Sequence, residues 1–415
     1  MLARLVPLLL LGACGDRALR LPDEEAVLTE DEAADGCTLV GDRVVCNHGH
    51  SINFRAENLH ERRLLAQANG FEDPDESLLL ATDRDGLLGT GMPDPLTPVL
   101  RASLGEVVRL RVVSFGDQYH TFHVHGHVWA DEAGTIIDNV DMLPAEVHEA
   151  TFVAGGGPDA ADDTERGGPG DWMYHCHVQT HMTSGMWSLL RVMEDGDPDL
   201  DLATDGRYPI ETPPALGGDG ETIDVWVVAI DARVTVARSF TSVGNRLADV
   251  TRPAWVYVPV EEGVWDAGDA EAIRDGVDPD TFQPWVLSLA LGTTVRVHLK
   301  NLIEGDDGED VPVSLHPHGV VYSVDDDGGT PQSVIPARGG TQDYEYLADT
   351  PRVWPYHDHA NPHHNVPRGL FASIVVHDPD DPVAVDRDYV VVMNDMDFAF
   401  VNGLGEGGGG GGHQH

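Results

Sequence analysis

Basic side chains are scarce in this sequence. Lys300 is the only lysine, and 25 lysines and arginines together stand against 71 aspartates and glutamates. Such a surface makes nucleic acid a poor partner, because contacts with phosphate groups need positive charge. The formal net charge of -46 has two interpretations. Either it is a solvated acidic shell, or it is a field that concentrates metal cations near a site.

The apolar run at the start of the chain is short. It extends from Leu5 to Leu11, after Arg4. It is too short to span a bilayer and is typical of a secretory signal. Its end at Cys14 resembles a bacterial lipoprotein cleavage box, in which the cysteine becomes the lipidated first residue. We therefore expect a lipoprotein-type signal peptide at residues 1–13, export to the periplasm or cell envelope, and membrane contact only through a lipid on Cys14. A plain signal peptide with an incidental cysteine is the alternative.

Cysteine is rare, with four in 415 residues. Cys37 and Cys46 flank a short segment whose pattern suits a small hairpin. A disulfide between them fits an exported protein in an oxidising setting, and two unbridged thiols are the alternative. The remaining cysteine, Cys176, has a histidine on either side and belongs to a different motif.

Short Val/Leu/Ile/Thr runs, separated by 46 glycines and 27 prolines, predict an all-β fold. A chain of this length can form two or three domains. The expected segments are the signal peptide at 1–13, an acidic tether with the small Cys37–Cys46 hairpin at 14–50, a first β domain at 51–195, a linker at 196–220, a second β domain at 221–400 and a glycine-rich tail at 401–415.

The most informative stretch is His175-Cys176-His177, followed by His181 and Met186. Two histidines, a cysteine and a weak methionine form the trigonal site that holds electron-transfer copper. Strand side chains alternate between two faces. We therefore expect His175 and His177 to point one way and Cys176 the other, so that one peptide links a copper at the thiolate to metal on the opposite face.

The two predicted β domains repeat each other. The segment Gly105 to Gly126 has a counterpart in Gly292 to Gly319, and Trp172 to His177 has one in Trp354 to His359. Both copies keep their His-x-His pairs, which are His123 and His125, His175 and His177, His316 and His318, and His357 and His359. Eight imidazoles without carboxylates at matching positions suit copper, which favours nitrogen donors.

The copies differ at the ligands of the thiolate site. In the second copy Val313 replaces His120, Asp358 replaces Cys176 and Leu370 replaces Met186, although His363 keeps the register of His181. We therefore expect an electron-accepting copper in the first domain and none of that kind in the second.

At these motifs the chain resembles the multicopper oxidases, the superfamily of laccase, ascorbate oxidase and ceruloplasmin. The resemblance covers most of residues 90–195 and 285–378. His120-x-x-His123-x-His125-Gly126 is similar to one family signature, and the stretch from His175 to Met186 is similar to another. It implies two tandem cupredoxin-like domains, each a Greek-key β-sandwich.

The resemblance also implies about four coppers per chain, each with its own ligands. His120, Cys176, His181 and Met186 would bind the type 1 copper. His123 and His316 would bind the type 2 copper. The type 3 pair would be bound by His125, His175, His177, His318, His357 and His359. Electrons from a reducing substrate would pass through Cys176 to the three-copper cluster, where O2 becomes water.

The order of the domains is informative as well. With the thiolate site first and only two β domains evident, the chain is similar to two-domain oxidases that are typically homotrimers. The histidines of both kinds of domain must then meet, either within a chain or, as we favour by analogy, between chains. Asp327 aligns with a family acidic residue that relays protons, which oxygen reduction consumes; a turn aspartate before Gly328-Gly329 is the alternative.

Two other functions fit part of this pattern. A copper nitrite reductase shares the domain count, but it needs one type 2 copper with few histidines. A copper-binding electron carrier without turnover needs only His120, Cys176, His181 and Met186, which leaves the histidines of the second domain unexplained. The reducing substrate is not encoded in any motif, and phenols and the reduced ions Cu(I), Fe(II) and Mn(II) stay open.

Overall fold

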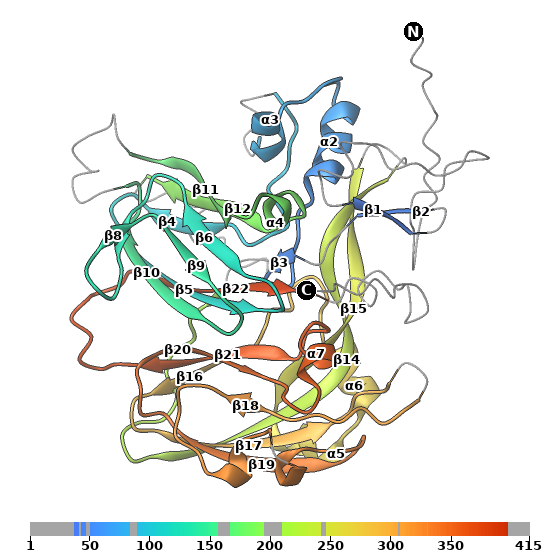
Figure 1. The fold of residues 1–415 in the computed structure, drawn as a ribbon, viewed down its shortest axis with the longest axis vertical. Helices are drawn as coiled ribbons and strands as arrows, with labels where there is room; N and C mark the ends of the chain where they lie inside the picture. The colour runs from blue at the N-terminus through green and yellow to red at the C-terminus, as the bar shows by residue number, and fades with distance from the viewer. Residues whose placement is uncertain are drawn as a thin grey trace, which may run out of the picture.

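The computed structural model describes residues 37–40, 43–46, 50–83, 89–156, 167–194, 210–241, 246–305, 308–329 and 331–396. Strands dominate this part of the chain and build two β-sandwiches, one above the other in Figure 1. The expectation of an all-β fold with two tandem cupredoxin-like domains is therefore confirmed. The expected signal peptide, Cys14 and the glycine-rich tail lie outside the described residues. Among the described helices, none has the length and apolar character needed to cross a membrane.

The first sandwich has two five-stranded sheets. One sheet has the order β4 (Leu100–Ser103), β12 (Trp187–Met193), β11 (Gly170–Cys176), β6 (His120–Val124) and β9 (Asn139–Met142). The other has the order β10 (Val147–Val153), β5 (Val107–Phe115), β22 (Arg387–Asp395) and β13 (Ile210–Glu211), with β3 (His50–Ile52) also paired to β22.

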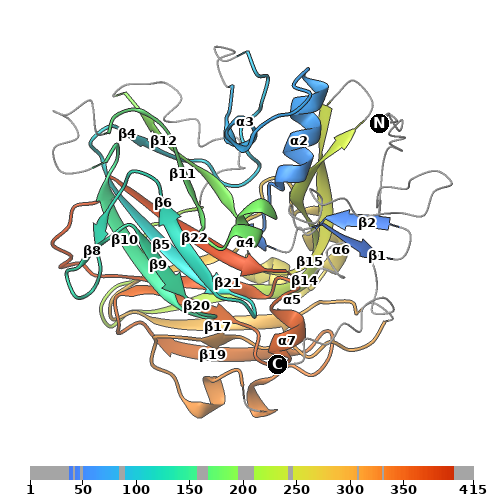
Figure 2. The same ribbon diagram turned by 45° about the horizontal axis from the view of Figure 1, so that its top comes forward.

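The second sandwich has two four-stranded sheets. One has the order β15 (Arg246–Val260), β14 (Thr222–Thr241), β17 (Thr294–Asn301) and β19 (Thr341–Leu347). The other has the order β16 (Val286–Ala290), β21 (Phe371–His377), β20 (Arg352–His357) and β18 (His316–Pro317). The long β14–β15 ribbon continues beyond its own sandwich and lies beside the helix α2 (Leu59–Ala68) of the first (Figures 1 and 2).

The last strand among the described residues, β22, does not belong to the expected second domain at 221–400. It runs parallel to β5 in the first sandwich. The strand is apolar on both faces, which is typical of a central strand. Tyr389, Val391 and Met393 enter the core of the first sandwich, whereas Val390 and Val392 enter a core that lies between the two sandwiches. β22 therefore completes the domain that carries the thiolate motif.

The core between the sandwiches fixes their contact. Phe115 of β5 stacks on Phe371 of β21, with ring centroids 4.8 Å apart. Nearby, the Val353 N–H of β20 donates to a Glu149 carboxylate oxygen of β10 at 3.1 Å. Burial of this apolar surface holds the two halves together.

Residues 53–83 and 89–99 include a helical cap that the sequence pattern did not predict. It holds α2 and α3 (Glu76–Leu80), and Asn58 caps α2 by accepting the His60 N–H at 2.8 Å. Leu59 and Leu65 of α2 pack with Trp187 of β12 in one apolar cluster. The cap thus covers the outer face of the sheet that ends in the His-Cys-His motif.

The expected small hairpin is present as β1 (Cys37–Val40) and β2 (Arg43–Cys46), with Cys37 opposite Cys46. The disulfide between them stays a prediction. Of the expected linker at 196–220, residues 210–220 are described, and β13 within them pairs with β22. The remaining short elements are β7 (Trp129–Ala130), β8 (Ile136–Ile137), α4 (Gln179–Thr183), α5 (Glu262–Ala267), α6 (Ala270–Asp275), η3 (Val324–Asp326), η4 (Pro331–Ser333) and α7 (Pro362–Asn365).

Candidate metal centre

Three side chains of the first sandwich converge at one buried point. His120 begins β6, Cys176 ends β11, and His181 lies in α4. The Nδ1 atoms of the two histidines are 3.2 Å apart, and they lie 3.8 and 3.6 Å from Cys176 Sγ. Two imidazole nitrogens and one sulfur that face one another are the donor set of a trigonal copper site.

Backbone hydrogen bonds hold these three ligands in register. In the antiparallel pair of β6 and β11, Cys176 is opposite Phe122. The turn of α4 then carries His181 back towards the strand ends. The Met186 N–H donates to the His181 carbonyl at 3.0 Å, and the Cys176 N–H donates to the Met186 carbonyl at 3.0 Å. Met186 is fully buried in the same core cluster as Cys176, so the fourth expected ligand is tied to both of the segments that carry the others.

Burial keeps this donor set neutral. It raises the pKa of Cys176 to about 11, although the Thr121 N–H, 3.5 Å from Sγ, opposes the shift. Burial also lowers the pKa of His120 to about 3 and that of His181 to about 4. A copper ion would supply the positive charge that favours the thiolate, since a coordinated thiol gives up its proton. The residues present therefore fit copper.

The first histidine set, His123, His125, His175 and His177, lies on the other face of the same strands. The ring nitrogens of His123, His125 and His175 all lie within 4.8 Å of one another. The His125 and His175 Nε2 atoms are 3.1 Å apart. The His177 ring centroid is 5.5 Å from that of His175 and 5.6 Å from that of His123. The alternation expected from His175-Cys176-His177 is thus observed.

The second histidine set, His316, His318, His357 and His359, repeats this geometry in the second sandwich. The His318 and His357 Nε2 atoms are 3.2 Å apart, and the His316 ring centroid is 4.9 Å from that of His359. β18 and β20 are antiparallel, with His316 opposite His357. In the first sandwich, His123 is opposite His175 in the same way.

Backbone carbonyls orient matching rings in the two sets. The His123 Nδ1–H donates to the Asp138 carbonyl at 2.7 Å, and the His316 Nδ1–H donates to the Asp327 carbonyl at 2.6 Å. His175 and His357 each use Nδ1 to contact the carbonyl of the next residue at 2.8 Å. Each of these rings therefore presents Nε2 as its lone-pair nitrogen, as a metal ligand requires.

The glycine after each first His-x-His pair has a packing role. Gly126 and Gly319 have φ values of 69° and 65°. A Cβ on Gly126 would lie 2.3 Å from the Trp172 ring, and one on Gly319 would lie 1.9 Å from the Trp354 ring. The two tryptophans begin the equivalent segments of the repeat, so the same close approach shapes both sandwiches.

The two histidine sets do not contact each other within one chain. All eight rings belong to described residues, and each ring contact between these histidines joins members of the same set. His125, His177 and His359 are exposed to solvent. Each set is therefore a cluster of four histidines that reaches the protein surface.

A buried carboxylate takes the place of the thiolate in the second sandwich. Asp358 is fully buried and accepts hydrogen bonds from the Ser314 N–H at 2.8 Å, the Asn361 N–H at 2.9 Å and the Asn365 amide at 2.9 Å. His363, which keeps the sequence register of His181, is exposed. The expected absence of a thiolate site here rests on these substitutions.

Asp327 lies beside the second histidine set. Its carboxylate oxygen Oδ1 is 3.6 Å from His316 Nδ1, and its Oδ2 accepts the Gly329 N–H at 3.0 Å. Partial burial and the negative charge of Asp327 raise the pKa of the neighbouring Tyr322. The carboxylate is thus near a histidine ligand and also holds the turn, so both interpretations of Asp327 keep a structural basis.

Sequence patterns missed three residues that surround the thiolate site. His50, Gln118 and Asp395 lie against His120 or His181. His50 and Asp395 come from β3 and β22, outside the repeat. Only Gln118 had a local signal, since it lies two positions before His120.

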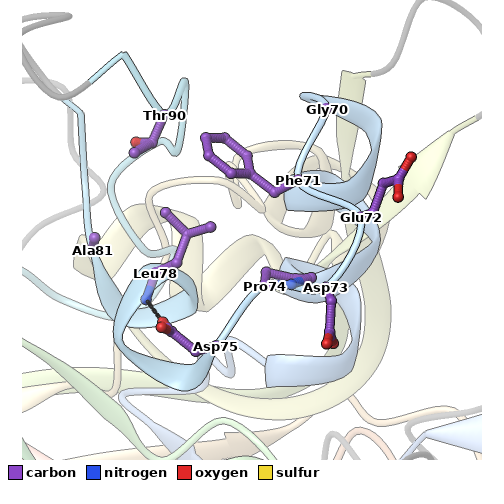
Figure 3. A pocket seen from close by; sticks show the side chains of 9 residues that line it. All are labelled: Gly70, Phe71, Glu72, Asp73, Pro74, Asp75, Leu78, Ala81 and Thr90. Atoms are coloured by element: carbon purple, nitrogen blue, oxygen red, sulfur yellow. Dashed lines mark hydrogen bonds between the residues drawn. The ribbon is translucent and has the colours of Figure 1, made fainter.

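A separate pocket lies in the helical cap (Figure 3). Its walls include Phe71, Leu78 and the acidic residues Glu72, Asp73 and Asp75, and the Asp75 carboxylate accepts the Leu78 N–H. The residues that line it include no histidine or cysteine. This pocket is therefore not part of the metal centre.

Family models described as multicopper oxidase match residues 71–196 and 279–381, together more than half of the chain. The chain is 32% identical over 116 residues to a probable nitrite reductase-hydroxylamine oxidoreductase fusion protein of Kuenenia stuttgartiensis, which covers 27% of this chain and 13% of that protein. It is 26% identical over 136 residues to the multicopper oxidase MmcO of Mycobacterium tuberculosis, covering 31% of this chain and 25% of that one. The chain thus spans a quarter or less of the length of these relatives.

Two solved structures from Nitrosomonas europaea match this chain with low TM-scores. A copper nitrite reductase has a TM-score of 0.19 and 18% identity, covering 71% of this chain and 87% of that one. A blue copper oxidase has a TM-score of 0.19 and 16% identity, covering 76% and 87%.

Proposed function

The chain belongs to the multicopper oxidase superfamily, and on that premise we propose that it couples one-electron oxidation of a reducing substrate to four-electron reduction of O2 to water. The observation that carries this proposal is that one chain holds the buried cluster of His120, Cys176 and His181 together with the two histidine sets. Each histidine set would be one half-site of a shared copper cluster. Bound copper would supply the one-electron chemistry at the buried cluster and the oxygen chemistry where the half-sites join.

We assign the copper ligands from the resemblance to the family. The type 1 copper would be held by His120, Cys176, His181 and Met186. The type 2 copper would be held by His123 and His316. The type 3 pair would be held by His125, His175, His177, His318, His357 and His359. About four coppers per chain would then be bound.

The strand β11 would link the two functions. Cys176 carries the sulfur of the buried site, while its direct neighbours His175 and His177 belong to the first histidine set. The His175 ring also contacts the Cys176 carbonyl through Nδ1 at 2.8 Å. The backbone and one hydrogen bond would therefore connect Cys176, which would accept electrons from the substrate, to His175 and His177, which would serve the oxygen-reducing cluster.

We further propose that the half-sites join between chains, in a homotrimer. Exposed apolar side chains support this, because an apolar surface beside exposed ligands is typical of an interface. In the segment that follows His125, Val128 and Ile136 are 47% and 65% exposed; in the segment that follows His318, Val321 and Val324 are 51% and 64% exposed. Contact between these surfaces would bury them and bring both half-sites together.

Asp327 would deliver protons to the shared cluster. Its carboxylate is exposed enough to exchange protons with water and lies 3.6 Å from His316 Nδ1. Oxygen reduction consumes four protons for each O2, so a carboxylate at this place suits the reaction.

The reducing substrate belongs to the small phenols or the reduced metal ions, and the acidic surface favours cations.

We also propose an exported protein of the periplasm or cell envelope, anchored by a lipid on Cys14.

Nitrite reduction is the second candidate function, because one relative is named a probable nitrite reductase fusion protein. The eight paired histidines favour oxygen reduction, since they exceed the ligands that a single type 2 copper needs. A third candidate, an electron carrier, would use the thiolate site alone.

The deciding experiment measures oxygen uptake and nitrite reduction by the copper-loaded protein, together with its copper content. The panel of donors contains a phenol, Cu(I), Fe(II) and Mn(II). About four coppers per chain with donor-dependent oxygen uptake supports the proposal. One copper per chain without oxygen uptake identifies a carrier, and nitrite-dependent turnover without oxygen uptake identifies a nitrite reductase.

A further inference from the structure

Gln118 bridges two histidines at the edge of the thiolate site. Its Oε1 atom is 3.0 Å from His181 Nε2, and its Nε2 atom is 3.1 Å from His50 Nε2. An amide offers one acceptor and two donors, so the two contacts use different ends of the same side chain.

The direction of both hydrogen bonds follows from the ligand role of His181. Its Nδ1 atom faces Cys176 Sγ at 3.6 Å, so a metal ligand at this place carries its ring proton on Nε2. That Nε2–H donates to the Gln118 carbonyl oxygen. The Gln118 amide then donates to His50 Nε2, which must accept. One side chain thereby fixes the tautomer of a ligand and contacts the ring beside it, whose Nε2 also lies 3.5 Å from Asp395 Oδ1.

His50 also covers the ligand ring. The rings of His50 and His181 are stacked, with centroids 4.0 Å apart and an angle of 15° between their planes. His50 is 7% exposed and His181 is 3% exposed. One face of the His181 ring is therefore covered by the His50 imidazole and does not contact solvent.

The position of His50 and Gln118 is set by β22. β3 and β22 are antiparallel, with His50 opposite Asp395. The Asp395 carboxylate accepts the Gln118 N–H at 3.0 Å. A Cβ on Gly116 would lie 2.5 Å from the same carboxylate, so the turn before Gln118 is packed directly against it.

The internal repeat offers a natural comparison. Because Val313 replaces His120 in the second copy, the residue in the register of Gln118 is Val311. Val311 is buried in the apolar core of the second sandwich. The bridging amide is thus present in the copy that keeps the copper ligands and absent in the copy that has lost them.

We propose that Gln118 and His50 are positioning residues of the type 1 copper, which hold His181 in its ligating tautomer and shield its ring from water. This inference rests on the proposed function. It predicts that a reducing substrate does not touch His181 directly and that electrons pass through the His50–His181 stack.

The first test replaces the bridging amide. Gln118→Ala removes the acceptor for the His181 Nε2–H, so His181 becomes a weaker donor. Loss of such a partner reduces metal affinity by about 10–100-fold. We expect the copper affinity of the type 1 copper site, the blue site, to fall within that range and its reduction potential to rise. Gln118→Glu keeps an acceptor oxygen and should restore the affinity. The matched control is Gln342→Ala, at a glutamine of β19 in the second sandwich.

The second test removes the stacked ring. In the copper-loaded protein, pulsed EPR after transfer to D2O reports how fast the His181 Nε2–H exchanges. We expect slow exchange in the wild type and in His50→Phe, which keeps a stacked ring, and fast exchange in His50→Ala. The matched control is His363→Ala, at an exposed histidine of the second sandwich.

The outcomes separate the two levels of the proposal. A blue wild type whose Gln118→Ala variant is folded and unchanged in affinity and potential contradicts the positioning role alone. Equal exchange rates in His50→Ala, His50→Phe and the wild type contradict the shielding role, whether or not the Gln118 variants fold. A wild type that binds no blue copper overturns both this inference and the proposed function.

Discussion

Asp358 in the second sandwich occupies the position that Cys176 has in the first. The Thr121 N–H points at Cys176 Sγ at 3.5 Å, and the Ser314 N–H, at the equivalent place in the repeat, donates to Asp358 at 2.8 Å. The second sandwich thus has an equivalent backbone at this place and fills the space with a hydrogen-bonded carboxylate.

The first prediction concerns Asp358, which stands where the first sandwich has Cys176. Asp358→Ala leaves the Ser314 N–H and one N–H of the Asn365 amide buried without their acceptor. Each unsatisfied donor costs about 1–3 kcal/mol, so we expect the free energy of unfolding to fall by roughly 3 kcal/mol. Urea unfolding measures it, with the exposed Asp349→Ala as control. The blue absorption of the folded variant should be unchanged; its loss would contradict a purely structural role.

The second prediction concerns pH. Partial burial alone would lower the pKa of His298, but its hydrogen bonds to Asp343 and Asp224 outweigh burial and raise it above 6.5. Protonated His298 therefore stabilises the folded protein below about pH 6.5, and this stabilisation is lost as the pH rises through the higher folded pKa. The carboxylates are exposed, so the gain is limited to about 1 kcal/mol.

The measurement compares the unfolding free energies of the wild type and His298→Ala between pH 5 and pH 9. We expect the wild type to have the larger free energy of unfolding at acid pH and the two proteins to have equal free energies at alkaline pH. A constant difference across the range would mean that the ring contacts with Trp226, rather than the proton, stabilise this face.

The grouping of the histidine sets could be predicted from the sequence because their spacing is local. His175, Cys176 and His177 alternate on one strand, and the repeat identified the second histidine set by the same rule. The structure brings each set together as expected. Their assignment to individual coppers stays a prediction.

Other features could not be predicted because they depend on contacts between distant parts of the chain. Gln118 and Asp395 are 277 positions apart, and β22 joins β5 across a similar distance. Periodicity reports which strand faces are buried but not which strands pair. The boundary expected at 221–400 therefore placed β22 in the wrong sandwich.

The third prediction tests the thiolate ligand. Cys176→Ser replaces the sulfur with a hydroxyl, which is a poor ligand for copper and keeps its proton. We expect complete loss of the blue absorption and a fall of oxygen uptake to background, while about three of the four coppers are retained. Absorption, copper analysis and an oxygen electrode provide the measurements. Persistent blue colour would remove Cys176 from the ligand set.

The fourth prediction tests the second half-site separately. His316→Ala removes one imidazole of the second histidine set but leaves the first sandwich untouched. We expect the blue absorption to stay within about 10% of the wild type, because the two sites share no ligand, and oxygen uptake to be abolished. Continued oxygen consumption at the wild-type rate would rule out a cluster that needs both sandwiches.

The fifth prediction addresses how the half-sites join. Ile136, in the segment that follows His125, is 65% exposed, and Ile136→Asp would place a charge in the proposed interface between chains. Desolvation of an unpaired carboxylate costs several kcal/mol, enough to dissociate the assembly at micromolar concentration. We expect light scattering to show monomers that keep the blue absorption but no longer reduce O2. Val264→Asp, on α5 and 43% exposed, is the matched control and should leave the trimer and its activity intact. A monomeric Ile136→Asp variant with full oxygen uptake would show that one chain completes the cluster alone, because dilution into monomers must separate any site that two chains share.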